Sequence, residues 1–224
     1  MIRRRAAGEP LQYVLGTAAF RRLELRVGPG VFIPRPETEL VAERAMELLP
    51  PRGILVDLCT GSGAIALSVA DERRDARVIA TEVAPAAVRW ATENRRASGL
   101  RVELLVGDLF EPLPPDLVGA VDVVVSNPPY VDETERELLP REVVDHEPPD
   151  ALFAPGSGTS VIRRIVGSAP EWLRPGGWVL LEIGETQGAA ATGLLSARGF
   201  RDVDVRKDLN GRDRIAEGRW TSQT

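Results

Sequence analysis

Ile54-Leu55-Val56-Asp57-Leu58-Cys59-Thr60-Gly61-Ser62-Gly63 is an apolar run that leads into two closely spaced glycines. Its first five residues predict a buried strand, and the alanine-rich and aliphatic residues 64–70 predict the start of a helix. Glycines in the intervening turn allow the backbone to approach a ligand closely. The turn reads D-x-x-x-G-x-G, not the dinucleotide pattern G-x-G-x-x-G, and no Lys-Ser/Thr follows as in a phosphate-binding loop. We therefore expect a strand–turn–helix unit that binds a ligand at its turn.

Strands and helices alternate from this unit to the end of the chain. Such alternation predicts an α/β fold with a mostly parallel sheet and helices on both faces. The expected strands are residues 54–58, 77–82, 102–107, 121–126, 177–183, 201–206 and 213–217. The expected helices are residues 63–73, 85–98, 159–173 and 186–198. Residues 128–157 are rich in proline and acids and are expected to form a loop or lid over the site.

The beginning of the chain has a different pattern. Residues 1–12 are polar and expected to be loose, and the alternation of apolar residues over 13–27 predicts a small β-hairpin. Proline and glycine make residues 28–36 a rigid loop, and apolar spacing predicts a helix over 37–49. The chain is accordingly divided into residues 1–50, with hairpin, loop and helix, and residues 51–224, the main α/β domain.

Acidic residues occur at or beside the ends of three predicted strands. Glu82 lies about twenty residues after the glycines, the separation at which an acid binds a ribose diol in nucleotide-binding βαβ units. Asp57 and Asp108 adjoin two further strand ends, so all three should border a crevice at the carboxyl edge of the sheet. The predicted cofactor-binding residues are Asp57, Cys59, Thr60, Gly61, Ser62, Gly63, Glu82, Asp108, Leu109 and Asn127.

Asn127-Pro128-Pro129-Tyr130 directly follows the apolar run of residues 121–126. Two successive prolines fix φ and remove two backbone donors, which leaves a stiff segment with free carbonyl acceptors. Asn127 adds a side-chain carbonyl, and Tyr130 adds an aromatic face. This combination suits a planar NH2 group, because two acceptors can hold its hydrogens while a ring packs on its plane. We expect the segment to orient such a nitrogen.

The order of glycine turn, Glu82, Asp108 and Asn-Pro-Pro-Tyr resembles a class I S-adenosylmethionine-dependent methyltransferase, with its Rossmann-like seven-stranded sheet. More narrowly, nearly the whole chain resembles the HemK/PrmC family of protein-(glutamine-N5) methyltransferases, which modify peptide chain release factors. The segments that carry the resemblance are G-E-P-L-Q-Y at 8–13, P-R-P-E-T-E at 34–39, G-D-L-F-E-P at 107–112, S-N-P-P-Y at 126–130, L-E-I-G at 181–184 and K-D-L-N-G-R-D-R at 207–214.

The resemblance implies S-adenosyl-L-methionine as cofactor and an antiparallel edge formed by residues 201–217. Asp108 and Leu109 would meet its adenine, and Asp57 would order the turn or lie near its amino-acid end. Asn127, Pro128 and Tyr130 would be the catalytic residues. The implied substrate-binding residues are Asn127, Pro128, Pro129, Tyr130, Arg35 and Glu37. The acids at 37 and 39 also fit a plain helix start, because carboxylates stabilise a helix N-terminus.

The chain departs from the family in two places. Members usually carry a helical domain of several dozen residues before G-E-P-x-Q-Y, whereas almost nothing precedes Gly8, so the chain is either trimmed or a short homologue with another client. Residues 155–163 also lack the usual Asp-Gly-Leu run and Tyr. Three acceptors therefore stay open: a release factor's Gly-Gly-Gln loop, a small amide or guanidine, and a nucleic-acid amino group. A homodimer could replace the missing front domain.

Composition limits the remaining possibilities. The net charge of −5 argues against a protein that binds nucleic acid mainly through phosphates. One cysteine permits no intrachain disulfide, which favours a cytoplasmic protein, and no apolar run reaches membrane-spanning length. His146 is the sole histidine and has no clustered partner, so no metal site is expected. Cys59 also lacks a nearby histidine, so we do not expect it to act as a nucleophile.

Overall fold

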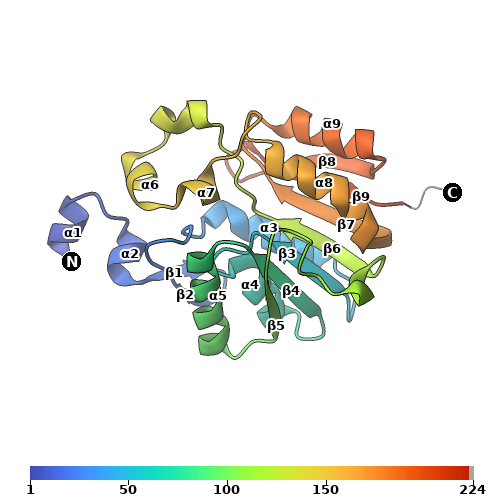
Figure 1. Cartoon of the computed structure of the whole chain (residues 1–224), viewed down its shortest axis with the longest axis horizontal. Helices are drawn as coiled ribbons and strands as arrows, with labels where there is room; N and C mark the ends of the chain where they lie inside the picture. Colours follow the sequence, from blue (N-terminus) through green and yellow to red (C-terminus); the bar gives the residue numbers. More distant parts are fainter. Residues whose placement is uncertain (222–224) are drawn as a thin grey trace.

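The computed structural model describes residues 1–221, which are organised around one seven-stranded sheet (Figure 1). Its strands are β3 (Ile54–Leu58), β4 (Arg77–Glu82), β5 (Val102–Val106), β6 (Val121–Ser126), β7 (Leu173–Glu182), β8 (Arg201–Lys207) and β9 (Asp213–Arg219). They lie in the order β5-β4-β3-β6-β7-β9-β8. The first five are parallel, and β9 pairs antiparallel with both β7 and β8. The predicted sheet and its antiparallel edge are confirmed; β7 begins four residues before its expected start.

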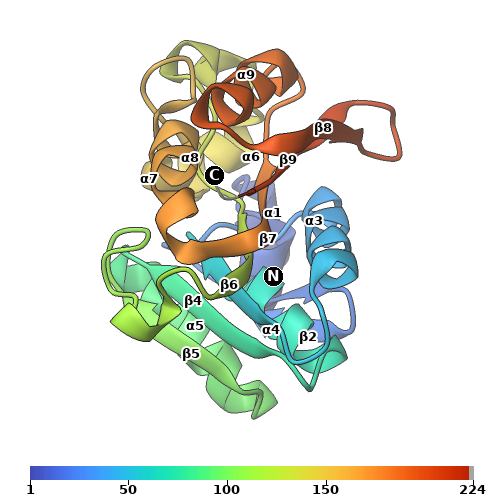
Figure 2. The ribbon, with the colours of Figure 1, turned by 90° about the vertical axis from the view of Figure 1, so that its right-hand side faces the viewer.

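Helices cover both faces of the sheet (Figures 1 and 2). One face packs against α3 (Pro36–Leu48), α4 (Ala64–Glu72) and α5 (Pro85–Ser98), and the other against α8 (Ser160–Trp172) and α9 (Gly188–Arg198). Within β3, Leu55 belongs to the first apolar core, whereas Val56 and Leu58 belong to the second. Burial on both faces explains why the central strands are continuous apolar runs.

The N-terminal hairpin is present but shorter than the sequence suggested. It consists of β1 (Thr17–Phe20) and β2 (Leu23–Arg26), which pair antiparallel. The expectation that it begins at residue 13 is wrong, because Leu11–Leu15 form the helix α2. Pro10 precedes this helix, and Gly16 ends it in the left-handed conformation with φ 81°. A short exposed helix, α1 (Ile2–Ala6), also occupies part of the segment expected to be loose.

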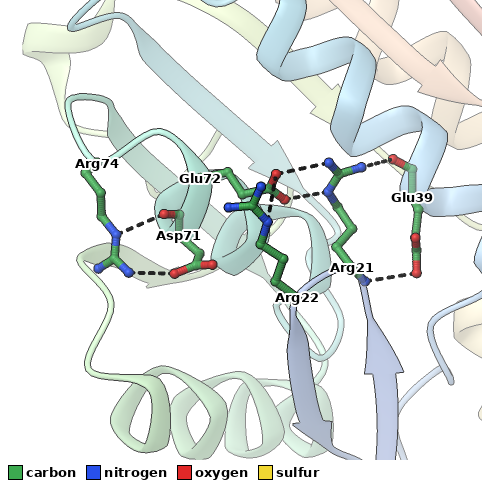
Figure 3. A network of polar contacts seen from close by, with 6 residues as sticks. All are labelled: Arg21, Arg22, Glu39, Asp71, Glu72 and Arg74. Carbon is green, nitrogen blue, oxygen red and sulfur yellow. Dashed lines mark hydrogen bonds and ion pairs between the residues drawn. The ribbon is translucent and has the colours of Figure 1, made fainter.

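Arg21, in the turn of the hairpin, forms hydrogen bonds to the helices α3 and α4 (Figure 3). Its guanidinium donates to both carboxylate oxygens of Glu72 on α4, at 2.6 and 3.1 Å. Its backbone N–H donates to Glu39 of α3 at 2.9 Å. Phe20 and Leu25 are buried in the same core as α3 and α4. The hairpin therefore holds the start of α3 in a fixed position, which matters because α3 contributes to the candidate site.

The segment between β6 and α8, for which a loop or lid was expected, contains several short helices. They are η2 (Glu133–Leu138), α6 (Arg141–His146) and α7 (Pro149–Leu152); a further short helix, η1 (Pro115–Leu117), precedes β6. Figure 1 shows α6 and α7 beside the carboxyl end of the sheet, as a lid would lie. Within residues 1–221, no helix combines the length and apolar character needed to cross a membrane.

Candidate active site

A cavity of about 680 Å³ lies at the carboxyl ends of the parallel strands. This is the edge at which ligands bind in open α/β sheets, between strands whose helices lie on opposite faces. Gly63 is not among the lining residues and instead caps the start of α4, with φ 86°. The predicted residues that line the cavity are Asp57, Cys59, Thr60, Gly61, Ser62, Glu82, Asp108, Leu109, Asn127 and Pro129.

Asp57 is a buried carboxylate at the end of β3, with 1% of its surface exposed. Its Oδ2 accepts hydrogen bonds from Thr60 Oγ1 at 2.5 Å and from the backbone N–H of Ala66 at 3.1 Å, which order the glycine turn. Oδ1 has no partner among residues 1–221. Burial raises the pKa of Asp57 to about 7. Asp57 thus keeps one unused acceptor oxygen, buried at the edge of the cavity that the residue lines.

Glu82 is held rigidly at the end of β4. Its Oε2 accepts from the backbone N–H of Gly61 at 2.9 Å, and its Oε1 accepts from those of Val83 and Ala84, also at 2.9 Å. These bonds fix both the carboxylate and the turn. Because a carboxylate oxygen can accept two hydrogen bonds, Oε2 keeps capacity for a hydroxyl donor in the cavity.

Cys59 adopts a left-handed backbone with φ 56°, a conformation that favours glycine. Burial and the nearby charge of Glu82 raise the pKa of the Cys59 thiol to about 12. A thiol of that acidity does not supply a thiolate at neutral pH, so a nucleophilic role is disfavoured.

Asp108 and Leu109 form the wall beyond β5. Arg164 of α8 donates to Asp108 Oδ2 at 2.6 Å and also lines the cavity. Leu109 is 7% exposed and packs into the second apolar core, with φ 49°. Together they contribute one carboxylate and one apolar surface to the cavity that the glycine turn also lines.

Asn127 is oriented by two residues to which the sequence assigned no role. Its Nδ2 donates to Thr38 Oγ1 at 3.2 Å, and the Thr38 hydroxyl donates to Glu182 Oε2 at 2.7 Å. Its Oδ1 receives no hydrogen bond from any residue between 1 and 221. The segments P-R-P-E-T-E and L-E-I-G contain both partners, but residue spacing cannot show that they meet. Asn127 therefore presents an unused carbonyl oxygen in the cavity wall.

Four predicted residues lie beside the cavity lining and not in it: Pro128, Tyr130, Arg35 and Glu37. The Tyr130 hydroxyl donates to Glu182 Oε1 at 3.3 Å, and burial raises the pKa of that phenol. Arg35 pairs with the buried carboxylate of Glu147. The loop before α3 instead contributes Phe32 and Pro34 to the lining, and the first turn of α3 contributes Thr38.

The backbone at Gly158 packs directly against the Asn-Pro-Pro-Tyr segment. A Cβ at this position would lie 1.9 Å from the carbonyl oxygen of Tyr130, and its φ is 71°. Gln187 donates to the carbonyl oxygens of Tyr130 at 2.8 Å and of Ser157 at 3.1 Å. The divergent segment 155–163 is therefore packed directly against the motif. Nothing in the sequence besides its glycines signalled this contact.

Comparison with known proteins identifies the family. The protein-family model described as Methyltransferase small domain matches residues 25–157. A release factor glutamine methyltransferase of Mycolicibacterium smegmatis is 51% identical over 218 residues, which cover 96% of this chain and 76% of the relative. This chain belongs to the release factor glutamine methyltransferase family. A Streptomyces coelicolor member is 47% identical over 226 residues, covering 98% of this chain and 79% of its own length.

A solved structure agrees with this family assignment. The release-factor-specific protein-(glutamine-N5) methyltransferase of Alicyclobacillus acidocaldarius is 28% identical and has a TM-score of 0.51. The match covers 88% of this chain and 99% of that structure. The family fold and the resemblance read from the sequence are thus both confirmed.

The carboxylate acceptors of the cavity fit the ammonium and hydroxyl groups of S-adenosylmethionine. The unpartnered Oδ1 of Asp57 can accept from an ammonium group, and Glu82 can accept from hydroxyls. An ideal Cβ on Gly61 would meet nothing within 4 Å, so the backbone is open to a ligand there. Among residues 1–221, no group of three or more His, Cys, Asp or Glu could hold a metal ion.

Proposed function

We propose that the protein transfers a methyl group from S-adenosylmethionine to the side-chain amide nitrogen of glutamine in the Gly-Gly-Gln loop of peptide chain release factors. The observation that carries the proposal is the free carbonyl oxygen of Asn127 in the cavity that Asp57, Glu82 and Asp108 also line. Family membership and the names of the relatives support the same acceptor.

The cofactor would be held by acceptors at the three strand ends. Glu82 would bind the ribose hydroxyls, Asp57 the amino-acid end, and Asp108 with Leu109 the adenine. When bound, S-adenosylmethionine supplies an electrophilic methyl group on a sulfonium sulfur. The remaining task of the protein is to orient the acceptor and to exclude water.

A carboxamide nitrogen is a poor nucleophile because its lone pair is delocalised into the carbonyl. Asn127 Oδ1 and the Pro128 carbonyl would accept hydrogen bonds from the two N–H groups of the glutamine amide and bias the nitrogen towards pyramidal geometry. Its lone pair would then point at the methyl carbon. The N–C bond would form as the C–S bond breaks with its electron pair left on sulfur, and the cationic amide would release one N–H proton to solvent as the product leaves. Positioning of this kind can lower a barrier by roughly 7–11 kcal/mol at best.

The test supplies the protein with methyl-labelled S-adenosylmethionine and three separate acceptors: a release factor, a mixture of free amino acids, and RNA or DNA. We expect label on the release factor alone, with none on a release factor whose Gly-Gly-Gln glutamine is alanine. Label on free amino acids alone would support the small-molecule alternative that the divergent residues 155–163 leave open. Label on nucleic acid, or on the glutamine-free release factor, would contradict the proposal.

A further inference from the structure

The side chain that holds Asn127 is itself held by a buried carboxyl group. Nδ2 of Asn127 donates to Thr38 Oγ1, which donates to Glu182 Oε2. Thr38 is 3% exposed and Glu182 is 1% exposed, so water competes little for these bonds. The three residues come from α3, from the end of β6 and from the end of β7. The contact therefore exists only in the assembled fold.

The charge of Glu182 decides the direction of this hydrogen-bond chain. A hydroxyl has a single proton, and an ionised carboxylate can only accept, so Thr38 must donate to Glu182. Thr38 then offers only lone pairs to Asn127, which must approach with its NH2 group. As a result the carbonyl oxygen of Asn127 is turned away from Thr38 and is free to accept a hydrogen bond.

We propose that Glu182, acting through Thr38, is a positioning residue that selects the amide orientation of Asn127 required to accept a hydrogen from the methyl acceptor. This inference rests on the proposed function, because it assigns the orientation a purpose in amide methylation. A protonated Glu182 can donate to Thr38 and release the hydroxyl proton towards Asn127. The amide of Asn127 would then rotate, and its NH2 group would meet the NH2 group of the substrate as one donor facing another.

The surroundings of Glu182 determine the pH at which this change occurs. Burial raises the pKa of Glu182 to about 7. Three groups oppose this effect: the hydroxyls of Thr38 and Tyr130, and the charge of Arg214 from β9. The charge of Glu37 in α3 repels that of Glu182 and, like burial, raises the pKa of Glu182. The ionised form prevails above this pH, so the productive orientation is lost as the pH falls through it.

Nuclear magnetic resonance can follow the orientation without any turnover. The sequence contains only three asparagines, Asn94, Asn127 and Asn210, so their side-chain NH2 signals are few and can be assigned with Asn127→Asp. We expect the Asn127 signal to titrate with a midpoint near 7. The titration should persist in Asp57→Asn and vanish in Glu182→Gln. A signal that does not titrate, or that still titrates in Glu182→Gln, overturns the inference.

Asn94 is the internal reference for this titration. It is 3% exposed, and its Nδ2 donates to the backbone carbonyls of Arg26 and Ser62, which carry no ionisable proton. Its signal should therefore stay constant over the same range of pH.

Turnover provides the second readout, measured as kcat at saturating methyl donor between pH 6 and 9. Thr38→Val, which keeps the shape and removes the hydroxyl, should lower kcat about tenfold or more, the scale of one lost hydrogen bond in the transition state. Thr38→Ser should restore most of it. Glu182→Gln should lower kcat at pH 8 and abolish the fall of kcat towards acidic pH. Equal kcat in the serine and valine variants, or a persistent acidic fall in Glu182→Gln, contradicts the inference.

Glu217→Gln is the matched control, because Glu217 is also buried, at 2% exposure, but pairs with Arg44 and Arg206 away from the cavity. This variant should lose stability and keep the wild-type shape of the pH profile. The two proposals also fail separately. If the wild-type protein methylates no release factor, the proposed function is contradicted. The titration of the Asn127 signal still tests the inference about Glu182 in that case. If the protein is active but the titration of the Asn127 signal does not depend on Glu182, only the inference is contradicted.

Discussion

Arg35 and Glu147 form an ion pair between two segments that are 112 residues apart in the sequence. Glu147 is 3% exposed and also accepts from the backbone N–H of Ile33 at 3.2 Å. The guanidinium of Arg35 packs over the ring of Phe32 at 4.6 Å. Burial nevertheless raises the pKa of Glu147, so its charge depends on this partner. The pair joins the loop before α3 to residues 133–152, which contain η2, α6 and α7 and are named here the lid segment.

Replacing Arg35 with alanine should therefore loosen the lid. The change leaves a buried carboxylate without its cation, which typically costs roughly 3–5 kcal/mol. We expect a lower free energy of unfolding in urea and faster amide hydrogen exchange in residues 141–152. Arg5→Ala is the control, because Arg5 pairs with Glu142 of the same lid, at 3.2 Å, but both side chains are 40% exposed. Its cost should stay below about 1 kcal/mol. Equal effects of the two variants would contradict the assigned role of Arg35.

Asn127→Ala should separate turnover from cofactor binding. It removes the carbonyl oxygen proposed to hold the substrate amide, so kcat should fall by about two to three orders of magnitude, as when one oriented transition-state donor is lost. The dissociation constant of S-adenosylhomocysteine, measured by calorimetry, should change by less than about threefold, roughly 0.6 kcal/mol. A large loss of cofactor affinity with normal turnover at saturation would show that Asn127 serves the cofactor instead.

The sequence was sufficient to predict the sheet and the side chains at its carboxyl edge. Asp57 and Glu82 lie at the ends of β3 and β4, and Asp108 and Asn127 come shortly after β5 and β6. Parallel strands end at one edge of a sheet. Their convergence in one cavity therefore follows from topology alone. The sequence could not reveal the link between Thr38 and Glu182, which are 144 residues apart and lie on elements whose separation depends on side-chain packing.

The mistaken start of the hairpin has a local physical cause. Three residues, Tyr13 to Leu15, are too few to distinguish a period of two from a period of 3.6. Tyr13 and Val14 are both buried, which a half-exposed strand would not allow, and the Tyr13 hydroxyl donates to the carbonyl oxygen of Val31. Packing against the rigid loop thus decided the conformation. Gly16, left-handed at the end of α2, was the available sign of a helix stop.

Asp57 should make the stability of the ligand-free protein depend on pH. Its pKa in the folded state is about 7, above the unfolded value of 3.8. The contribution of Asp57 to the stability of the folded protein is therefore fully present below the pKa of the unfolded state. It is lost as the pH rises through the pKa of the folded state. Between pH 5 and 8, Tm should fall less in Asp57→Asn than in the wild type, by at least about 2 °C, or roughly 1 kcal/mol.

Thermal unfolding followed by circular dichroism, at four pH values, checks this prediction. Asp116→Asn is the control, because Asp116 lies on the surface in an ion pair with Arg77 and 61% of its side chain is exposed. It should leave the pH dependence of Tm unchanged. Parallel curves for Asp57→Asn and the wild type would refute the raised pKa of the buried Asp57 carboxyl group.

Gly158 and Gly156 provide a test of how closely the divergent segment packs against Asn-Pro-Pro-Tyr. Both have a left-handed backbone, with φ of 71° and 68°. An alanine Cβ at 158 would overlap the carbonyl oxygen of Tyr130, whereas one at 156 would meet nothing within 4 Å. Gly158→Ala should therefore cost roughly 3 kcal/mol or more and lower kcat, because the motif must move. Gly156→Ala carries only the backbone strain of about 1–2 kcal/mol and should keep its kcat. Both variants are compared by chemical unfolding and by methyl transfer. Equal stability and equal kcat in the two variants would contradict this contact.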